Sequence, residues 1–219
     1  AQLSLPPLLN VLEILRERPA RGITFLSSGG TVYGPSRSEL IAEDHPTEPI
    51  TSYGIMKLAC EKYVRMYEQL YGVPATVLRC ANVYGEHQPA IRSQGVVAVI
   101  LDRAARGEPI PLYGDGSIVR DFVYVGDVAR VILRAIGARA RPPVVNVGSG
   151  SGCSLAELVA HVAEILGRPL AIDRRPDRGF DVPRMVLDVA LARRAFAFTP
   201  TPLAEGLRRT VAARPDTFR

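Results

Sequence analysis

A tyrosine and a lysine four residues apart, Tyr53 and Lys57, lie in the stretch from Thr51 to Lys62. On a helix the two side chains project from one face, with the lysine one turn after the tyrosine. A phenol has a pKa near 10 and must be acidified by about 2–3 units to act as a base at neutral pH, and a nearby ammonium supplies such a field. The spacing therefore predicts a proton-transfer pair. The alternative is a packed aromatic ring beside a solvated helix charge.

The composition predicts a globular protein of the cytoplasm. The chain has 219 residues, of which 47% are hydrophobic and 22% charged. No apolar run approaches the roughly 18–20 residues that span a bilayer, and no secretory signal is visible. The cysteines and histidines lack the spacing of metal ligands or of a disulfide framework, so we expect buried thiols and no metal. These residues are Cys60, Cys80, Cys153, His45, His87 and His161.

The net charge of +5 and the pI of about 9.4 indicate a partner that carries negative charge. The positive charge comes almost entirely from arginines that are spread along the chain, without a basic tract or interleaved aromatic residues. Nucleic-acid binding is therefore disfavoured, and we expect an anionic small ligand.

The hydrophobic pattern predicts helices that alternate with short apolar strands. Strands are expected at 23–28, 75–85, 144–150 and 170–175, and helices at 3–18, 51–71, 93–106, 128–136, 154–166 and from 201 onward. Two β-rich arms around Asp115-Gly116, within 110–125, predict a small hairpin or strand pair. The alternation predicts an α/β fold with a mostly parallel sheet, and ligands bind such sheets at the carboxyl ends of the strands.

Four segments in order resemble the extended short-chain dehydrogenase/reductase family, most closely its nucleotide-sugar epimerases. They are SSGGTVYG at 27–34, SYGIMK at 52–57, RCANVYG at 79–85 and VRDFVYVGDVA at 119–129. The resemblance implies an incomplete Rossmann-type parallel sheet with a smaller C-terminal substrate-binding lobe. Residues 1–90, with segments near 120–149 returning, would form the nucleotide-binding part and 91–219 mainly the lobe. It also implies NAD as cofactor, a nucleotide-diphosphate sugar as substrate and a homodimer that uses the helix of Tyr53.

The resemblance also assigns catalytic roles. Tyr53 would take the proton from the sugar hydroxyl, while Lys57 holds the nicotinamide ribose and lowers the pKa of the tyrosine. The family position that carries a serine or threonine near the reacting hydroxyl is Gly29 here. We expect Thr31 to supply that hydroxyl, with Ser28 as its substitute. If neither hydroxyl reaches the substrate, Tyr53 acts alone and the rate falls by about 10–100-fold.

The remaining site residues follow from the same comparison. Ser27 and Cys80 are expected to line the NAD site together with Tyr53 and Lys57. The expected substrate contacts are Asn82, Leu112, Tyr113, Arg120, Arg178 and Asp181, with the arginines on the diphosphate because their planar forks suit phosphate oxygens. Each has a structural alternative: a loop cap for the asparagine, strand packing for the leucine and tyrosine, and surface charge for the arginines.

Two departures from the family pattern limit the function. The sugar dehydratases carry Asp-Glu where this chain has Gly30-Thr31, so epimerisation or 4-keto reduction is expected, and a binding relative without turnover stays open because of Gly29. No glycine fingerprint for the NAD pyrophosphate precedes the first residue. We therefore expect a fragment that lacks about 90–100 residues, binds little NAD and leaves a sheet edge uncovered.

Overall fold

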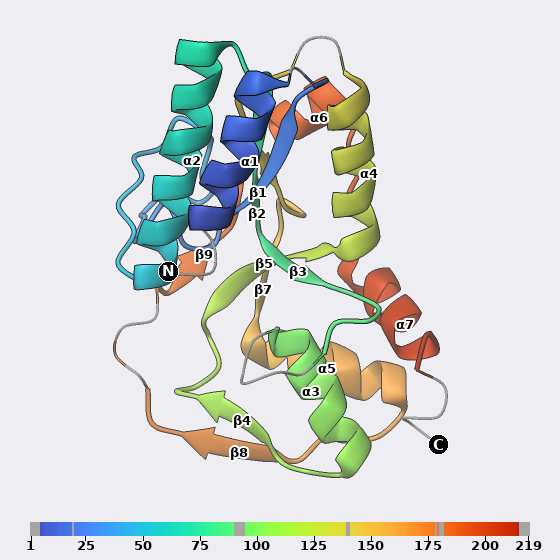
Figure 1. Ribbon diagram of the computed structural model, residues 1–219. Coiled ribbons are helices and arrows are strands. Elements are labelled where there is room, and N and C mark those ends of the chain that lie inside the picture. Colours follow the sequence, from blue (N-terminus) through green and yellow to red (C-terminus); the bar gives the residue numbers. More distant parts are fainter. Residues whose placement is uncertain are drawn as a thin grey trace.

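The computed structural model describes residues 5–18, 20–89, 95–138, 141–177, 179 and 182–214. Figure 1 shows two lobes that share the long strand β5 and the segments around it. The helices are α1 (Leu5–Glu17), α2 (Ser52–Tyr71), α3 (Val96–Arg106), α4 (Val125–Gly137), α5 (Leu155–Leu166), α6 (Ala190–Phe196) and α7 (Leu203–Ala212). The strands are β1 (Ile23–Ser28), β2 (Ala75–Cys80), β3 (Asn82–Tyr84), β4 (Ile110–Tyr113), β5 (Val119–Tyr124), β6 (Val144–Val147), β7 (Gly152–Ser154), β8 (Ile172–Arg175) and β9 (Arg184–Met185).

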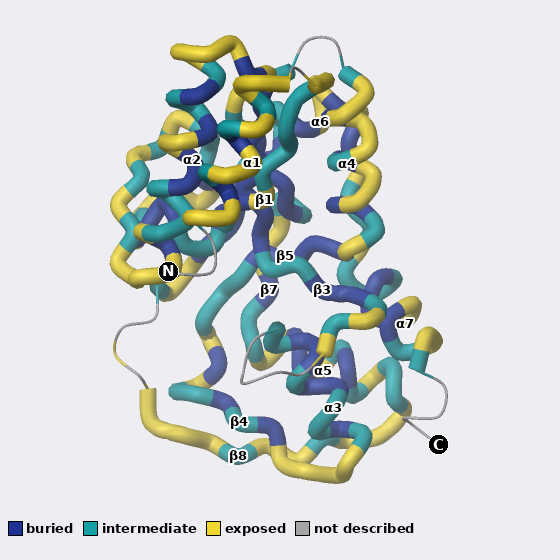
Figure 2. Tube along the Cα trace, in the orientation of Figure 1, coloured by how far each residue is buried: buried dark blue, intermediate teal, exposed yellow. Residues whose placement is uncertain are grey.

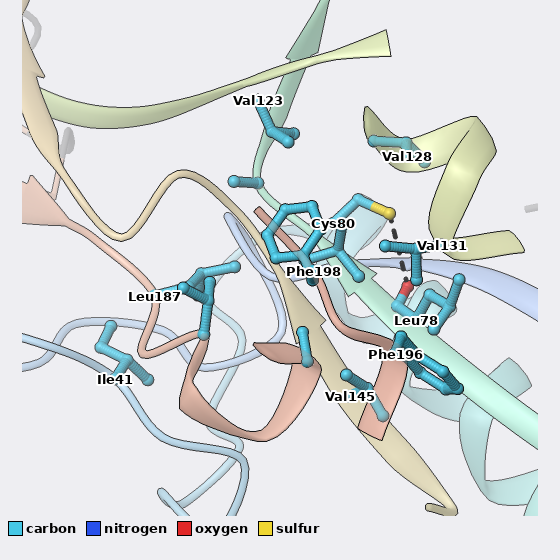
Figure 3. Packing of buried hydrophobic residues seen from close by; sticks show 14 of the residues in the cluster. Ile41, Leu78, Cys80, Val123, Val128, Val131, Val145, Leu187, Phe196 and Phe198 are labelled. Carbon is cyan, nitrogen blue, oxygen red and sulfur yellow. Dashed lines mark hydrogen bonds between the residues drawn. The ribbon is translucent and has the colours of Figure 1, made fainter. Parts of the chain in front are cut away.

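The first lobe is a parallel sheet in the order β1-β2-β6 with helices on both faces. Every residue of the central strand β2 is buried, which explains its nearly continuous apolar sequence. Ala75 and Val77 face a core shared with α1 and α2. Leu78 and Cys80 face the opposite core, shared with α4 and α6 (Figure 3). Alternate side chains of β2 thus pack against different helical layers on the two faces of the sheet. The predicted α/β fold with a parallel sheet is confirmed.

The second lobe has its own core, formed by α3, α5, α7 and the strands between them (Figure 1). Its largest wholly buried side chain is Tyr84 of β3, and each of the three helices contributes one wholly buried leucine: Leu101, Leu158 and Leu207. The parallel pair β4 and β8 lies along the outer side of this lobe, and Figure 2 shows much of β8 exposed.

The helix that carries Tyr53 and Lys57 begins and ends as its sequence predicts. The Thr51 hydroxyl caps the first turn by accepting a 3.1 Å hydrogen bond from the Gly54 amide. Gly72, with φ of 66°, closes the last turn and donates its amide to the carbonyl of Glu68. Helix α5 begins with a capping box formed by Ser154 and Glu157.

The predicted hairpin at 110–125 is wrong. Its first arm, β4, pairs in parallel with β8, and its second arm, β5, pairs with β3, β7 and β9. The connection runs from residue 114 to residue 118, so it is longer than the two-residue turn that joins adjacent strands. Ile110 and Phe122 both bury in the core of the second lobe, so the two arms share a core without pairing with each other.

Strand β1 hydrogen-bonds only to β2 among the described strands, so its other edge is open. Leu26 in this strand is 43% exposed. Within the described residues, no helix has both the length and the apolar character needed to cross a bilayer.

Candidate active site

The proton-transfer pair predicted from the sequence lies where α2 passes the carboxyl end of β1. The ammonium of Lys57 donates a 2.9 Å hydrogen bond to the carbonyl oxygen of Leu26, and its nitrogen lies 5.8 Å from the centroid of the Tyr53 ring. A second ring, that of Phe25, lies 5.0 Å from the same nitrogen. The tyrosine and the lysine therefore share one face of the helix, as their spacing predicts.

Tyr53 and Lys57 open into a cleft of about 360 Å³ between β1, β2 and α4. The phenol is half exposed, so a ligand in the cleft can reach it. The cleft is lined by Leu26, Ser27, Ser28, Tyr53, Lys57, Cys80, Ala81, Val83, Val125, Val128, Ala129 and Ile132. Four predicted catalytic and cofactor residues besides Lys57 thus line the same cleft. They come from β1, α2 and β2, and they are Ser27, Ser28, Tyr53 and Cys80.

The electrostatics of Tyr53 differ from the expectation. Burial raises the pKa of the phenol above its ordinary value, a negative charge on Cys80 would raise it further, and the side chain of Ser28 lowers it. The ammonium of Lys57 is directed to the Leu26 carbonyl instead of the phenol oxygen. The predicted acidification of Tyr53 by Lys57 is therefore not present in this arrangement, because desolvation outweighs the favourable polar contact.

Of the two candidate hydroxyls, the structure brings Ser28 to Tyr53. Ser28 lines the cleft and interacts with the phenol. Thr31 is outside the residues that line the cleft, and its hydroxyl is buried without a hydrogen-bond partner among the described residues. A Cβ atom at Gly29 would lie 2.6 Å from Leu187 and 3.0 Å from the Arg79 carbonyl oxygen. Packing therefore explains why a glycine occupies the family's serine or threonine position.

A buried ion pair beside the cleft was missed in the sequence. The guanidinium of Arg79 on β2 donates three hydrogen bonds of 2.8–3.2 Å to the carboxylate of Glu61 on α2. The hydroxyl of Ser27 donates to the same carboxylate. An arginine inside the otherwise apolar strand ATVLRC, and a glutamate one turn after Lys57, were the signals that predict such a pair. Ser27 was expected to bind the cofactor, but its hydroxyl donates its hydrogen bond to Glu61.

The cleft fits one end of the expected cofactor. Apolar side chains of α4 form one wall, and a phenol, an ammonium and a serine hydroxyl stand together at the other side. A flat ring attached to a ribose suits this arrangement, since the ring can pack on the wall and the sugar hydroxyls can meet the polar groups. Lys57 is the one charged residue in the lining. The residues present therefore fit the nicotinamide and its ribose, and they offer little to a pyrophosphate.

The glycine-rich turn at 148–152 packs on a buried carboxylate. Asp121 accepts hydrogen bonds from the Ser149 amide and hydroxyl, both at 2.7 Å, and from the amides of Gly150 and Leu187. A side chain at Gly148 would collide with this carboxylate. Burial raises the pKa of Asp121 and these donors oppose the rise. Through these hydrogen bonds the turn holds Asp121, the residue that follows Arg120 on β5.

The predicted substrate residues lie away from the cleft, on the strands of the second lobe. Asn82 donates a 3.0 Å hydrogen bond to the carbonyl of Asp121, and Arg120 donates a 2.7 Å hydrogen bond to the carbonyl of Val182. Leu112 is buried, and the ring of Tyr113 lies 6.0 Å from the guanidinium carbon of Arg175. Arg178 and Asp181 fall outside the described residues. None of these described side chains is among the residues that line the cleft of Tyr53.

A larger cleft of about 490 Å³ lies against α5 and the start of α7. Glu157, His161 and Arg193 contribute its charged and titratable groups. It contains none of the predicted catalytic, cofactor or substrate residues, so the smaller cleft at Tyr53 is the candidate active site. Among the described residues, no group of histidine, cysteine and acidic side chains has the geometry of a metal site.

Comparison with known proteins identifies the family of the chain. Residues 8–148 match the NAD dependent epimerase/dehydratase family. A putative UDP-glucose 4-epimerase of Methanocaldococcus jannaschii is 37% identical over 204 residues, which are 93% of this chain and 66% of that protein. The chain spans about two thirds of the length of the curated relatives it matches.

Two solved structures share the fold. One is a UDP-glucose 4-epimerase of Thermotoga maritima with UDP-glucose, with a TM-score of 0.91 and 36% identity over 97% of this chain and 69% of that one. The other is a UDP-glucose 4-epimerase of Thermus thermophilus in complex with NAD, with a TM-score of 0.87 and 36% identity over 98% of this chain and 69% of that one. The chain therefore belongs to the NAD dependent epimerase/dehydratase family.

Proposed function

We propose that the protein acts as an NAD-dependent nucleotide-sugar 4-epimerase of the UDP-glucose/UDP-galactose type. The observation that carries the proposal is the grouping of Tyr53, Lys57 and Ser28 at the open end of one cleft. The similarity to UDP-glucose 4-epimerases, one of them bound to UDP-glucose and one to NAD, supports the choice of substrate and cofactor.

NAD, held in the cleft by Lys57 and the apolar wall of α4, would supply the hydride acceptor and donor that inversion at the sugar carbon requires. Tyr53 takes the proton of the reacting hydroxyl at its phenol oxygen and gives it back when the hydride returns. Ser28 donates a hydrogen bond beside that oxygen and stabilises the negative charge there. Lys57 leaves the Leu26 carbonyl to hold the ribose, which also brings a positive charge toward the phenolate.

Residues of the second lobe would bind the nucleotide diphosphate. Arg120 and Asn82 lie at the ends of neighbouring parallel strands, β5 and β3, with Arg120 fixed by the Val182 carbonyl. Arg178, Asp181, Leu112 and Tyr113 complete the proposed substrate set. An arginine suits a diphosphate because its planar fork donates two parallel hydrogen bonds.

The test is to incubate the full-length form of the protein with NAD and UDP-glucose and to measure UDP-galactose. We expect turnover, and we expect Tyr53→Phe to lower kcat by about 10²–10⁴-fold, the range for one positioned proton-handling group. Net consumption of NADH or NADPH with a 4-keto sugar would instead identify a 4-keto-sugar reductase. Retained binding of the sugar nucleotide without any turnover would identify a non-catalytic relative.

We also propose a cytoplasmic homodimer. Along the side of α2 opposite the sheet, Ile55, Tyr63 and Leu70 are 56%, 37% and 66% exposed and follow at helical spacing. An apolar stripe of this kind suits a second copy of the same helix. The three cysteines are free, which supports a reducing compartment.

A further inference from the structure

Glu61 connects three elements that meet at the proton-transfer pair. On α2, Tyr53, Lys57 and Glu61 follow at intervals of four residues, so their side chains lie along one face over two turns. The Glu61 carboxylate accepts hydrogen bonds from Arg79 on β2 and from Ser27 on β1. The carboxylate therefore joins the helix to both strands next to the cleft.

The last three residues of β1 each contact a different turn of α2. Within Leu26–Ser28, the carbonyl of the first residue accepts from Lys57, the hydroxyl of the second donates to Glu61, and the side chain of the third interacts with Tyr53. A slide of the helix along the strand would break all three contacts together. The contact with Glu61 is the buried one, whereas the side chains of Lys57 and Tyr53 are partly exposed.

The ion pair is held rigidly from its far side as well. The side chains of Arg79 and Glu61 are only 7% and 3% exposed. The guanidinium carbon lies 4.8 Å from the centroid of the Tyr33 ring, and another nitrogen of the group donates a 3.2 Å hydrogen bond to the carbonyl of Glu43. The Tyr33 hydroxyl in turn donates a 2.6 Å hydrogen bond to Asn146 on β6. A buried charge with every partner in place resists displacement, because movement leaves a charge unpaired away from water.

We propose that Glu61, held by Arg79 and Ser27, is a positioning residue that sets the register of α2 on β1 and thereby places Lys57 and Tyr53 in the cleft. Its kinetic consequence rests on the proposed epimerase function, whereas its effect on the placement of Lys57 does not. Glu61 is not among the residues that line the cleft, and it acts on the cleft through Ser27 and through the placement of α2.

Lysine labelling measures the placement of Lys57 without any turnover. The chain has two lysines, and Lys62, exposed on the same helix, is the internal reference. Competitive acetylation followed by mass spectrometry gives the ratio of the Lys57 rate to the Lys62 rate. We expect Ser27→Ala to raise this ratio roughly threefold, since one buried hydrogen bond is lost while the ion pair stays. Glu61→Gln, which keeps the shape and removes the charge, should raise it further.

Tyr67→Phe is the matched control. It removes the hydrogen bond that the Tyr67 hydroxyl donates to Glu13 and so loosens α2 at its contact with α1, away from the cleft. The ratio should stay at its parent value in this variant, with melting temperatures recorded for all variants. If Glu61→Gln does not fold, Ser27→Ala decides the question alone. An unchanged ratio in Ser27→Ala, or an equal rise in Tyr67→Phe, would overturn the proposal.

Steady-state kinetics provide the second measurement. In the nucleotide-sugar assay we expect Ser27→Ala to lower kcat roughly 10-fold with KM within about twofold, because the reacting groups and not the sugar nucleotide are misplaced. A changed labelling ratio with no turnover even in the parent protein would reject the epimerase and support the positioning role. Turnover in the parent protein, together with an unchanged kcat and an unchanged labelling ratio in Ser27→Ala, would support the epimerase and reject the positioning role.

Discussion

The ammonium nitrogen of Lys57 donates a 2.9 Å hydrogen bond to the carbonyl oxygen of Leu26. This contact ties the functional lysine to the end of the strand that opens on the cleft. It also keeps the positive charge away from the phenol oxygen of Tyr53, whose pKa burial raises. In the proposed reaction the Lys57 ammonium must therefore leave the Leu26 carbonyl oxygen and bind a ribose hydroxyl when the cofactor binds.

Replacing this lysine tests that exchange. Lys57→Met keeps the length of the side chain and removes its charge, so we expect kcat to fall by about 10²–10³-fold, with weaker NAD binding as well. Lys62→Met is the control, since it removes the chain's other lysine from an exposed position on the same helix. Steady-state kinetics and NAD titration measure both. Equal losses in the two variants would contradict a specific role for Lys57.

Gly29→Ser restores the hydroxyl that the family pattern carries, and we expect it to harm the protein. The new side chain would meet Leu187 and the carbonyl of Arg79, so overpacking should lower the free energy of unfolding by about 1–3 kcal/mol without raising kcat. Gly30→Ser is the matched control, because a Cβ there has no neighbour within 4 Å and should change stability by less than about 0.5 kcal/mol. Urea denaturation measures both variants. A faster Gly29→Ser enzyme of parent stability would be the contrary result.

The buried thiol of Cys80 makes stability fall at alkaline pH. Burial raises the pKa of Cys80 from 9.0 to about 12. Above pH 9 the unfolded chain loses this proton while the folded chain keeps it, so the folded state binds more protons and the free energy of unfolding decreases by up to roughly 1.4 kcal/mol per pH unit. Urea denaturation at about pH 8 and about pH 10 should show a smaller decrease in Cys80→Ala. Identical decreases in both proteins would refute the assignment.

The apolar side of α2 predicts where two copies meet. Substituting Ile55 and Leu70 together by lysine should raise the dimer dissociation constant at least about 10-fold, since charges would be buried in the contact. Leu133→Lys is the control, because Leu133 is 71% exposed on α4, a different helix. Sedimentation velocity at several concentrations distinguishes the outcomes. A dimer as stable as that of the parent would show that the interface does not involve this side of α2.

Local patterns in the sequence predicted most elements of the fold. Thr51 and Gly72 mark the ends of α2 because capping is a property of a few neighbouring residues. The buried strands β1, β2 and β6 were visible as short apolar runs. The hairpin at 110–125 could not be judged in the same way, since the partner of β4 is β8, more than fifty residues further along the chain. Strand pairing over such a distance is decided by burial, which no local pattern records.

The sequence by itself determined that Tyr53 and Lys57 share one helix face, because the helical repeat fixes that relation wherever the helix lies. It also determined the family, through motifs in a fixed order. Tertiary structure decided which groups surround the pair: Ser28 instead of Thr31, the Leu26 carbonyl under the lysine, and the Glu61 carboxylate between two strands. These contacts join residues far apart in the chain, so the packing of α2 on the sheet alone sets their distances and pKa values.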